Sequence, residues 1–192
     1  MDDAELAAAI AERLEGRAVA CAESFTAGRI SEAFAGVTKA SEWFRGGVVA
    51  YQVGVKRALL GVEAASVFSE AAAAEMATGV GELLDADVTV SSTGVAGDVP
   101  EDGVPPGTVV IGTTVGDSCR TDVHHFEGDA LAVCVAATRQ ALEDLLDHLE
   151  SVGPDQGGPD QGEPDQGEPD QDERVVPAEQ HRGERPVAGR AG

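Results

Sequence analysis

Basic residues are scarce in this chain of 192 residues. Thirteen Lys and Arg stand against 35 Asp and Glu, so the net charge is −22 with histidine neutral. Without a basic stripe the chain cannot neutralise a row of phosphates, and we expect no nucleic-acid partner. Aromatic residues make up only 4%, and the two lysines are Lys39 and Lys56. This composition is typical of a salt-rich cytoplasm, where concentrated cations screen the repulsion among carboxylates.

Cysteines are few, and long apolar runs are lacking. The three cysteines, Cys21, Cys119 and Cys134, are widely spaced and form no C-x-x-C pair, which favours a reduced intracellular protein. No apolar run approaches the roughly 20 residues that cross a bilayer. The first residues are acidic, whereas a signal peptide begins with basic residues. We therefore expect a cytoplasmic protein with no membrane partner.

The last forty or so residues differ in composition from the rest. From Ser151 onward the unit Pro-Asp-Gln-Gly recurs, at 154–157, 159–162 and 164–167. Such a segment cannot bury enough apolar surface to offset the entropy of its own chain. The sequence therefore predicts one folded domain over residues 1–150 and a disordered acidic tail over 151–192.

Hydrophobic periodicity divides residues 1–150 into alternating helices and strands. The predicted order is α-β-α-β-α-α-β-β-β-α, which favours an α/β sandwich whose sheet is partly parallel with an antiparallel edge. The helices are expected at 3–14, 27–36, 53–60, 70–84 and 129–149, and the strands at 17–22, 46–51, 87–92, 108–115 and 120–126. Trp43 and Phe44, in the loop before the second strand, are expected to anchor the core or to join a subunit contact.

Three polar or glycine-rich turns follow predicted strands, at 22–28, 51–56 and 92–97. Ligands of open α/β sheets bind at the carboxyl ends of the strands, so these turns mark a candidate site. Ser24 and Thr26 lie in the first turn, before a helix. A hydroxyl at that position most often caps the helix. The alternative is a hydroxyl that attacks a ligand held by the free N–H groups of the helix.

A lysine near these turns offers a base for such a hydroxyl. Serine is a weak nucleophile until a neighbour takes its proton, and a desolvated lysine can do so. Lys56 is the candidate base, and Ser41 or Tyr51 could relay the proton. The alternative is that Lys56 is a surface charge beside Arg57.

Two other patterns could form a ligand-binding site. The glycine turn at 93–97 could hold a phosphate with its bare N–H groups, or it could simply end a strand. His124 and His125 are adjacent on a predicted strand and face opposite ways, so they cannot easily share one metal ion. No other group of residues has metal-ligand spacing, and we expect no metal.

Six segments of the chain stand in the order and spacing of a known family. The chain resembles the CinA C-terminal domain, the nicotinamide-nucleotide amidohydrolase family, over about residues 5–148. The matching segments are Ala22–Gly28, Ser41–Tyr51, Lys56 with Leu59–Val62, Phe68–Glu70, Thr93–Gly97 and Gly107–Val109.

The resemblance implies a three-layer α/β/α domain that hydrolyses the carboxamide of nicotinamide mononucleotide to nicotinate mononucleotide and ammonia. It implies no metal or organic cofactor, a small-molecule nucleotide substrate and association into a homo-oligomer. Two other functions stay open, namely an amidase for another small amide and a catalytically silent nucleotide-binding module. The implied catalytic residues are Ser24, Ser41, Tyr51 and Lys56, and the implied substrate-binding residues are Thr26, Gly28, Thr93, Gly94 and Gly97.

The roles of the two serines are open within this resemblance. Ser24 is the expected nucleophile, with Lys56 as its base, but Ser24 and Ser41 could exchange roles.

The chain departs from the family pattern at four positions near the predicted site. Phe25 stands where the family usually has Cys, and Ala27 where it has Gly. Asp98 follows the glycine turn where the family has Pro, and Ala130 stands where an arginine usually opens the last helix. The added carboxylate and the missing arginine both disfavour a phosphate, which favours the alternative of another amide substrate.

Overall fold

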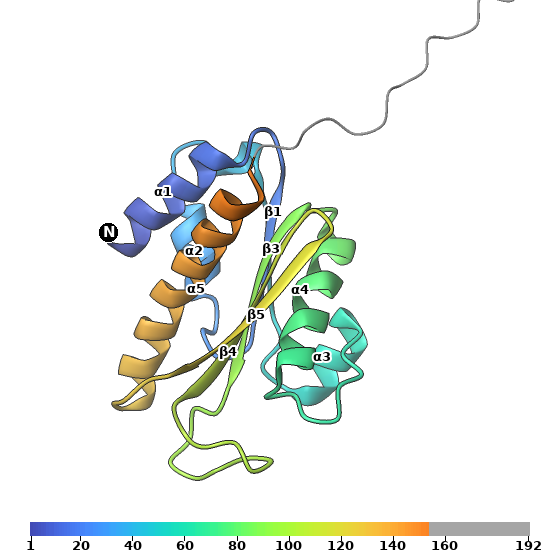
Figure 1. Ribbon diagram of the computed structural model, residues 1–192, viewed down its shortest axis with the longest axis vertical. Helices are drawn as coiled ribbons and strands as arrows, with labels where there is room; N and C mark the ends of the chain where they lie inside the picture. The colour runs from blue at the N-terminus through green and yellow to red at the C-terminus, as the bar shows by residue number, and fades with distance from the viewer. Residues whose placement is uncertain (154–192) are drawn as a thin grey trace, which may run out of the picture. The chain divides into compact units, whose positions relative to one another are not determined.

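A computed structural model describes residues 1–153, and most of the tail predicted at 151–192 lies outside the described residues. One five-stranded sheet lies between two layers of helices (Figure 1). The order of the elements is the predicted one, except that the short 3-10 helix η1 lies in the predicted loop before the second strand. The helices are α1 (Asp3–Arg13), α2 (Arg29–Ala35), η1 (Ala40–Glu42), α3 (Val53–Leu60), α4 (Glu70–Leu84) and α5 (Ala130–Val152), and the strands are β1 (Val19–Glu23), β2 (Phe44–Val49), β3 (Val88–Gly94), β4 (Thr108–Val115) and β5 (Ser118–His125).

The sheet is mixed, as predicted. Its strand order is β2-β1-β3-β4-β5. The strands β2 and β3 run parallel to β1, whereas β4 and β5 form an antiparallel hairpin at one edge. Every residue of β1 is buried, as expected for a central strand covered on both faces. The carboxyl ends of β1, β2 and β3 therefore meet at one end of the sheet.

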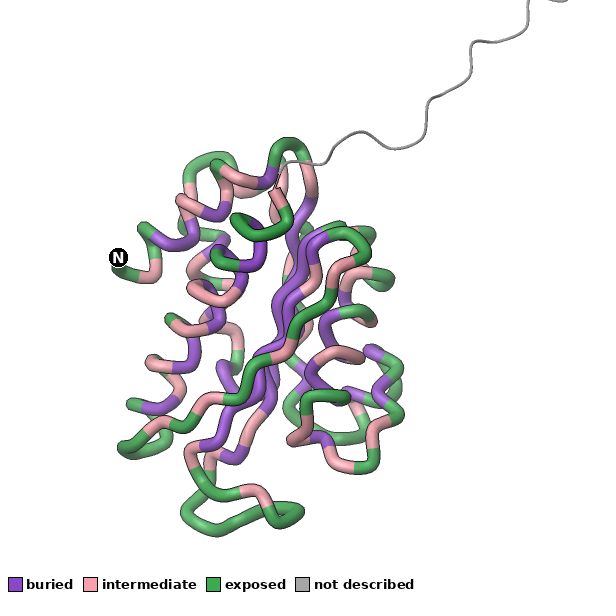
Figure 2. The backbone as a smooth tube through the Cα atoms, viewed as in Figure 1, coloured by how far each residue is buried: buried purple, intermediate pink, exposed green. Residues whose placement is uncertain are grey.

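The two helical layers bury separate clusters of apolar side chains. In Figure 1, α1, α2 and α5 cover one face of the sheet, and α3 and α4 cover the other. Leu6 and Leu145 belong to the cluster on the first face, and Met76 and Val80 to the cluster on the second. Figure 2 shows the buried strands between these layers and the exposed loop that joins β3 to β4. The three-layer α/β/α fold thus leaves the ends of the strands free to form a site.

Trp43 and Phe44, at the start of β2, pack against the hydrophobic core. Strand β2 begins at Phe44, two residues earlier than predicted. The ring centroid of Phe34 lies 5.8 Å from that of Trp43 and 5.5 Å from that of Phe44. These contacts give the two residues the role of a core anchor. The last helix ends at Val152, past the predicted end at 149 and past the predicted domain boundary at 150.

No helix within residues 1–153 combines the length and the apolar character that a membrane crossing requires. His124 and His125 turn to different partners, as neighbours on a strand should. His124 contacts Asp144 of α5, and His125 contacts Thr108 of β4.

His148 is buried where α5 crosses β4 and β5. Its side chain is 0% exposed, and its Nδ1 and Nε2 atoms lie 2.8 Å from Thr113 Oγ1 and 2.9 Å from Ser118 Oγ. Burial, followed by the charge of Arg120, lowers the pKa of His148 from 6.5 to about 4. The imidazole is therefore neutral in the folded protein at neutral pH.

We predict that acid destabilises the fold through His148. The unfolded chain takes up this proton below pH 6.5, whereas the folded protein resists it down to about pH 4. The unfolded state therefore binds more protons in this window, and the free energy of unfolding falls as the pH drops from 6.5 to 4, by on the order of 3 kcal/mol. Denaturant unfolding across the window measures the slope. His148→Gln should flatten it, and an unchanged slope would contradict the assignment.

Candidate functional site

A pocket of about 220 Å³ opens at the carboxyl ends of β1 and β3. The three predicted turns, at 22–28, 51–56 and 92–97, all contribute to its wall. Two further segments complete it, one before α4 and one in the β3–β4 loop. The lining residues are Ser24, Phe25, Tyr51, Gln52, Val53, Lys56, Val67, Phe68, Gly94, Ala96 and Glu101. The pocket therefore lies at the end of the sheet where the sequence predicts a site.

Lys56 is buried in the wall of this pocket. It is 2% exposed, and its Nζ makes no hydrogen bond or ion pair with any other described residue. The Nζ atom lies 5.6 Å from the centroid of the Phe68 ring, within the range of a cation–π contact. Burial lowers the pKa of Lys56, and the charge of Glu101 opposes that shift. A lysine that loses its proton readily and faces a pocket can serve as a base.

Ser24 faces the same pocket. It is 6% exposed, and its backbone N–H donates to the carbonyl of Ser92 at 2.9 Å. Within residues 1–153 its hydroxyl neither caps α2 nor bonds to another side chain, so the capping alternative is wrong for Ser24. No hydrogen bond joins Ser24 Oγ to Lys56 Nζ among these residues. Catalytic hydrogen bonds often tighten only when substrate binds.

The carboxylate of Glu23 occupies the start of α2 instead. Glu23 is 0% exposed and ends β1. Its oxygens accept hydrogen bonds from the backbone N–H groups of Gly28, Ile30 and Ser31 at 2.9, 3.0 and 2.8 Å. They also accept from the hydroxyls of Thr26 and Ser31 at 2.7 and 2.6 Å. The backbone N–H groups at the start of α2, which could have bound an external anion, are therefore already hydrogen-bonded to Glu23.

The predicted ligand contacts of Thr26 and Gly28 are corrected by this network. The hydroxyl of Thr26 lies 2.7 Å from Glu23 and 2.7 Å from Ser92 Oγ, and Thr26 is fully buried. The N–H of Gly28 is held by Glu23, and its φ of 102° is a left-handed conformation that favours glycine. Both residues shape the turn that presents Ser24.

In the glycine-rich turn at 93–97, Thr93 and Gly94 have different surroundings. Thr93 is buried and donates its hydroxyl proton to the carbonyl of Val67 at 2.6 Å, so it fastens the segment before α4, and it is not among the residues that line the pocket. Gly94 lines the pocket. A Cβ there would lie 2.5 Å from the Thr108 carbonyl oxygen and 3.1 Å from the Phe25 ring, so no larger residue fits.

Ser41 does not reach the pocket. It lies in η1, before the start of β2, and β2 runs parallel to β1. Ser24 follows the end of β1, so the strands separate the two serines by their whole length, roughly 20 Å at 3.3 Å per residue. The predicted participation of Ser41 in this site is therefore wrong within one chain. Tyr51 follows β2 and lies at the rim, 62% exposed.

A second pocket, of about 310 Å³, adjoins the first. Ala96 lines both pockets, and Gly97 lines only the second. Two carboxylate residues, Asp98 and Glu127, contribute to its wall, and no Lys or Arg does. The predicted contact of Gly97 with a ligand thus belongs to an acidic neighbour of the Ser24–Lys56 pocket.

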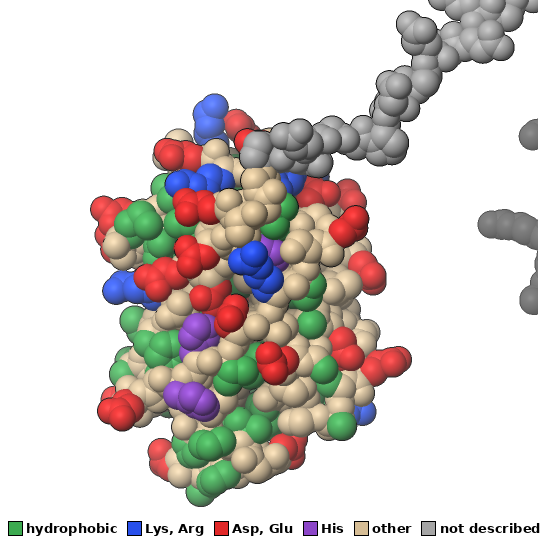
Figure 3. All heavy atoms as spheres, viewed as in Figure 1, with side chains coloured by type: hydrophobic (Ala, Val, Ile, Leu, Met, Phe, Trp, Pro, Cys, Tyr) green, Lys and Arg blue, Asp and Glu red, His purple; other side chains and the backbone are tan. Residues whose placement is uncertain are grey.

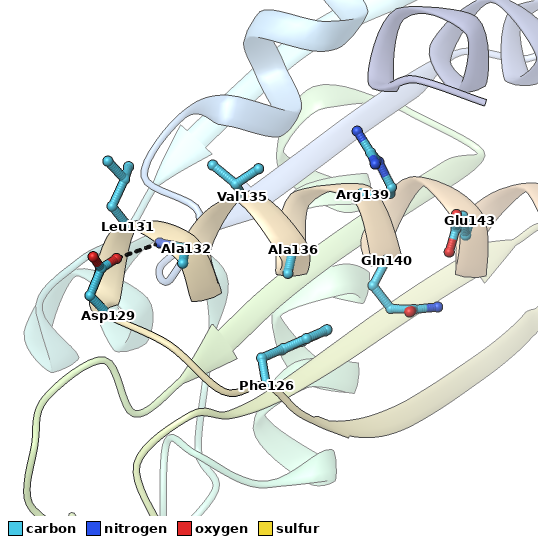
Figure 4. Close-up of a pocket in the computed structure, with 9 residues that line it drawn as sticks. All are labelled: Phe126, Asp129, Leu131, Ala132, Val135, Ala136, Arg139, Gln140 and Glu143. Carbon is cyan, nitrogen blue, oxygen red and sulfur yellow. Dashed lines mark hydrogen bonds between the residues drawn. The ribbon is translucent and has the colours of Figure 1, made fainter.

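A larger hollow, of about 690 Å³, lies along α5 (Figure 4). Phe126, Leu131 and Val135 give it an apolar wall, and Leu131 is 61% exposed. It contains no serine, cysteine or lysine that could act as a nucleophile or base. Chemistry rather than size therefore identifies the smaller pocket as the candidate active site.

No role in the site was predicted for three residues, Glu23, Phe68 and Glu101. Glu23 could have been noticed as the one charged residue in an otherwise apolar strand before a turn rich in donors. Phe68 and Glu101 reach the pocket from loops of irregular structure, and no periodic pattern points to them.

The sequence of this chain is similar to those of known proteins. The family model for the CinA C-terminal domain matches residues 3–149. A putative competence-damage inducible protein of Bacillus velezensis is 40% identical over 119 residues, which are 59% of this chain and 28% of that protein. The chain thus spans less than a third of that relative's length. Protein YdeJ of Escherichia coli is 36% identical over 152 residues, covering 75% of this chain and 88% of that protein.

Solved structures agree with these sequence matches. A crystal structure of a competence-damaged protein (CinA) superfamily member from Klebsiella pneumoniae has a TM-score of 0.74 and 32% identity. The similarity covers 79% of this chain and 99% of that one.

We predict that Glu23→Gln lowers the free energy of unfolding by about 2–5 kcal/mol. Glutamine keeps the shape of the side chain, but its NH₂ group would face N–H and O–H donors that now bind a carboxylate oxygen. Denaturant unfolding measures the loss. Glu32→Gln, at an exposed position on α2, is the matched control and should change little. Equal effects of the two substitutions would contradict the role given to Glu23.

Proposed function

The chain belongs to the CinA C-terminal domain family, and we propose from this membership and from its pocket that it hydrolyses the carboxamide of nicotinamide mononucleotide. The products are nicotinate mononucleotide and ammonia, a step in recycling pyridine nucleotides. The observation that carries the proposal is the buried Lys56, whose Nζ has no partner among residues 1–153 and which shares a pocket with Ser24.

In the proposed mechanism Lys56 is neutral and takes the proton of Ser24 Oγ while that oxygen attacks the amide carbon. The backbone N–H of Phe25 directly follows the nucleophile and has no acceptor among the described residues. It is the candidate donor to the oxyanion. The C–N bond then breaks, and Lys56 returns the proton to the departing ammonia. Water next attacks the acyl-enzyme ester, with Lys56 again as base, and frees the carboxylate and Ser24.

The shape of the pocket suits one end of a nucleotide. Its volume of about 220 Å³ is below the roughly 300–1,000 Å³ of typical small-molecule sites. Phe25 and Phe68 offer aromatic walls for the pyridine ring, and the exposed Tyr51 covers the rim. We assign the pocket to the ring and its amide, while the sugar extends past the rim.

The mechanism calls for neither a metal nor an organic cofactor. Residues 1–153 hold no group of three His, Cys, Asp or Glu side chains arranged to bind a metal ion. Self-association and a cytoplasmic location stay predictions from the sequence.

The first test is ammonia release from nicotinamide mononucleotide by the purified full-length protein in molar potassium chloride. We expect release by the unmodified protein and a loss of at least about a hundredfold in Ser24→Ala and in Lys56→Ala, because removing a base or nucleophile typically costs 10² or more.

Two variants control this test. Lys39→Ala removes the other lysine, which lies on the surface, and should keep full activity. Ser41→Ala should also keep it, because Ser41 lies at the opposite end of the sheet. Binding of the nucleotide without turnover by the folded, unmodified protein would instead support the catalytically silent module.

The dependence of kcat on pH is a separate prediction. Only the neutral amine is a base, so kcat should rise with pH as Lys56 loses its proton. Burial lowers the pKa of Lys56 from 10.5, which places the midpoint below that value. Glu101→Gln removes the negative charge that raises this pKa and should move the midpoint to lower pH. Glu82→Gln, on the exposed side of α4, is the control. A midpoint that stays in place or rises in Glu101→Gln would contradict Lys56 as the base.

A further inference from the structure

The start of α3 lies at the rim of the Ser24–Lys56 pocket with unused hydrogen-bond donors. Gln52 is the N-cap residue of α3, and its side chain makes no capping hydrogen bond. The backbone N–H groups of Gln52, Val53 and Gly54 have no acceptor among residues 1–153. Gln52 and Val53 line the pocket, and Val53 is 44% exposed. Free N–H groups at a helix start favour an anion, and here they border a pocket.

The other four α-helices within residues 1–153 already have a side-chain oxygen at their start. Asp2, Ser69 and Asp129 cap α1, α4 and α5 (Figure 4 shows the cap of α5). The carboxylate of Glu23 holds the N–H groups of α2. A phosphate at any of these four starts competes with a group of the protein, whereas at α3 it finds the N–H groups free.

Lys56 is a second, independent feature that points to a ligand at this helix start. It follows Gln52 and Val53 by four and three residues, so it lies on their face of α3, and helical side chains lean toward the N-terminus. It is 2% exposed, and its Nζ has no hydrogen-bond or ion-pair partner among residues 1–153. The buried amine and the free N–H groups therefore open into one pocket, and neither has a partner in the protein.

The wall of the pocket also holds the opposite charge. Glu101 lines it together with Phe25 and Phe68, and a carboxylate beside aromatic rings suits a flat cationic ring. A nucleotide with a pyridinium ring carries a positive ring and a negative phosphate. The two kinds of wall, a carboxylate on one loop and N–H donors on α3, match these two charges.

Basic side chains offer a phosphate little at this end of the molecule. Lys56 is the one Lys or Arg that lines either this pocket or its acidic neighbour. In Figure 1 the β3–β4 loop, which contributes Glu101, lies at the lower end. On the face drawn in Figure 3, Lys and Arg side chains gather mainly in the opposite half of the molecule. Backbone donors are therefore the main groups available to hold a phosphate beside the pocket.

We propose that the start of α3 binds the phosphate of the nucleotide whose amide reaches Ser24. This inference rests on the proposed amide hydrolysis and assigns a phosphate site to it. The N–H groups of Val53 and Gly54 and the side-chain amide of Gln52 donate to the phosphate oxygens at the rim. The sugar spans the distance from the ring in the pocket to this rim. Such a site uses backbone donors, so it needs none of the basic side chains that are scarce in this chain.

The test removes one of these N–H groups without changing the charge. Val53→Pro does so at the first residue of α3, where proline is tolerated. Gln52 already has the extended conformation that a residue before proline prefers, with φ of −88° and ψ of 144°. The substitution is made in the full-length Ser24→Ala variant, so that binding is measured without turnover.

The ligands are nicotinamide mononucleotide and nicotinamide riboside, which share ring, amide and sugar and differ in the phosphate. We expect Ser24→Ala to bind the nucleotide about tenfold or more tightly than the riboside, because hydrogen bonds to a charged group are strong. Adding Val53→Pro should reduce this ratio of affinities by about tenfold. Gln52→Glu keeps the shape of the side chain, places a negative charge at the proposed site and should reduce the ratio at least as much.

A matched control makes the same change at another helix start. Ala130→Pro removes the N–H of the first residue of α5, and the preceding Asp129 is also extended, with φ of −74° and ψ of 168°. Ala130 lines the acidic pocket, so this variant also tests whether the phosphate lies there instead. We expect the ratio of affinities to stay unchanged in Ala130→Pro.

The two proposals fail in different ways. If the folded, unmodified protein releases no ammonia from the nucleotide, the amidohydrolase proposal fails, and the ratio of affinities still decides the phosphate site. The inference is overturned if the nucleotide binds no more tightly than the riboside, absence of binding included. It is equally overturned if the ratio stays unchanged in Gln52→Glu or in folded Val53→Pro, or if it falls as far in Ala130→Pro.

Discussion

The hydrogen bonds to the carboxylate of Glu23 are the interaction on which the site depends. A fully buried carboxylate is tolerated only when its oxygens are satisfied, and here three backbone N–H groups and two hydroxyls satisfy them. The donors come from the turn and from the first residues of α2. Glu23 therefore fixes how the chain leaves the central strand and enters the helix. Ser24 lies within that short stretch, so its position in the pocket follows from the network.

Lys56 imposes the second constraint, from the opposite face of the sheet. A lysine buried without a carboxylate partner costs stability, since desolvation disfavours its charged form. The fold places Phe68 against it and leaves its Nζ free among the described residues. An apolar residue at this position would pack better than Lys56 does. A residue that is locally destabilising is often kept for function. Lys56 is therefore a stronger indicator of the functional site than any of the glycine turns.

The sequence predicted the order of elements, the mixed sheet and the meeting of three turns, because these depend on periodicity and on the polarity of parallel strands. The same polarity excludes Ser41, which precedes a strand whose end, not its start, faces the pocket. The roles of Thr26 and Thr93 could not be predicted, since a hydroxyl near a site looks alike whether it faces a ligand or a buried partner. Glu101 was missed because its loop has no periodic pattern.

The acidic composition also acquires a local meaning at this site. Most of the acidic side chains are exposed, and their effect on solvation in salt does not depend on their position on the surface. Glu23 and Asp129 differ, because each takes the place that an anion could hold at a helix start. Because each carboxylate belongs to the chain, the local N–H groups are satisfied with no ligand bound, and a phosphate gains nothing from displacing them. At these two helix starts the acidic side chains therefore have a structural role, which carboxylates on the open surface do not have.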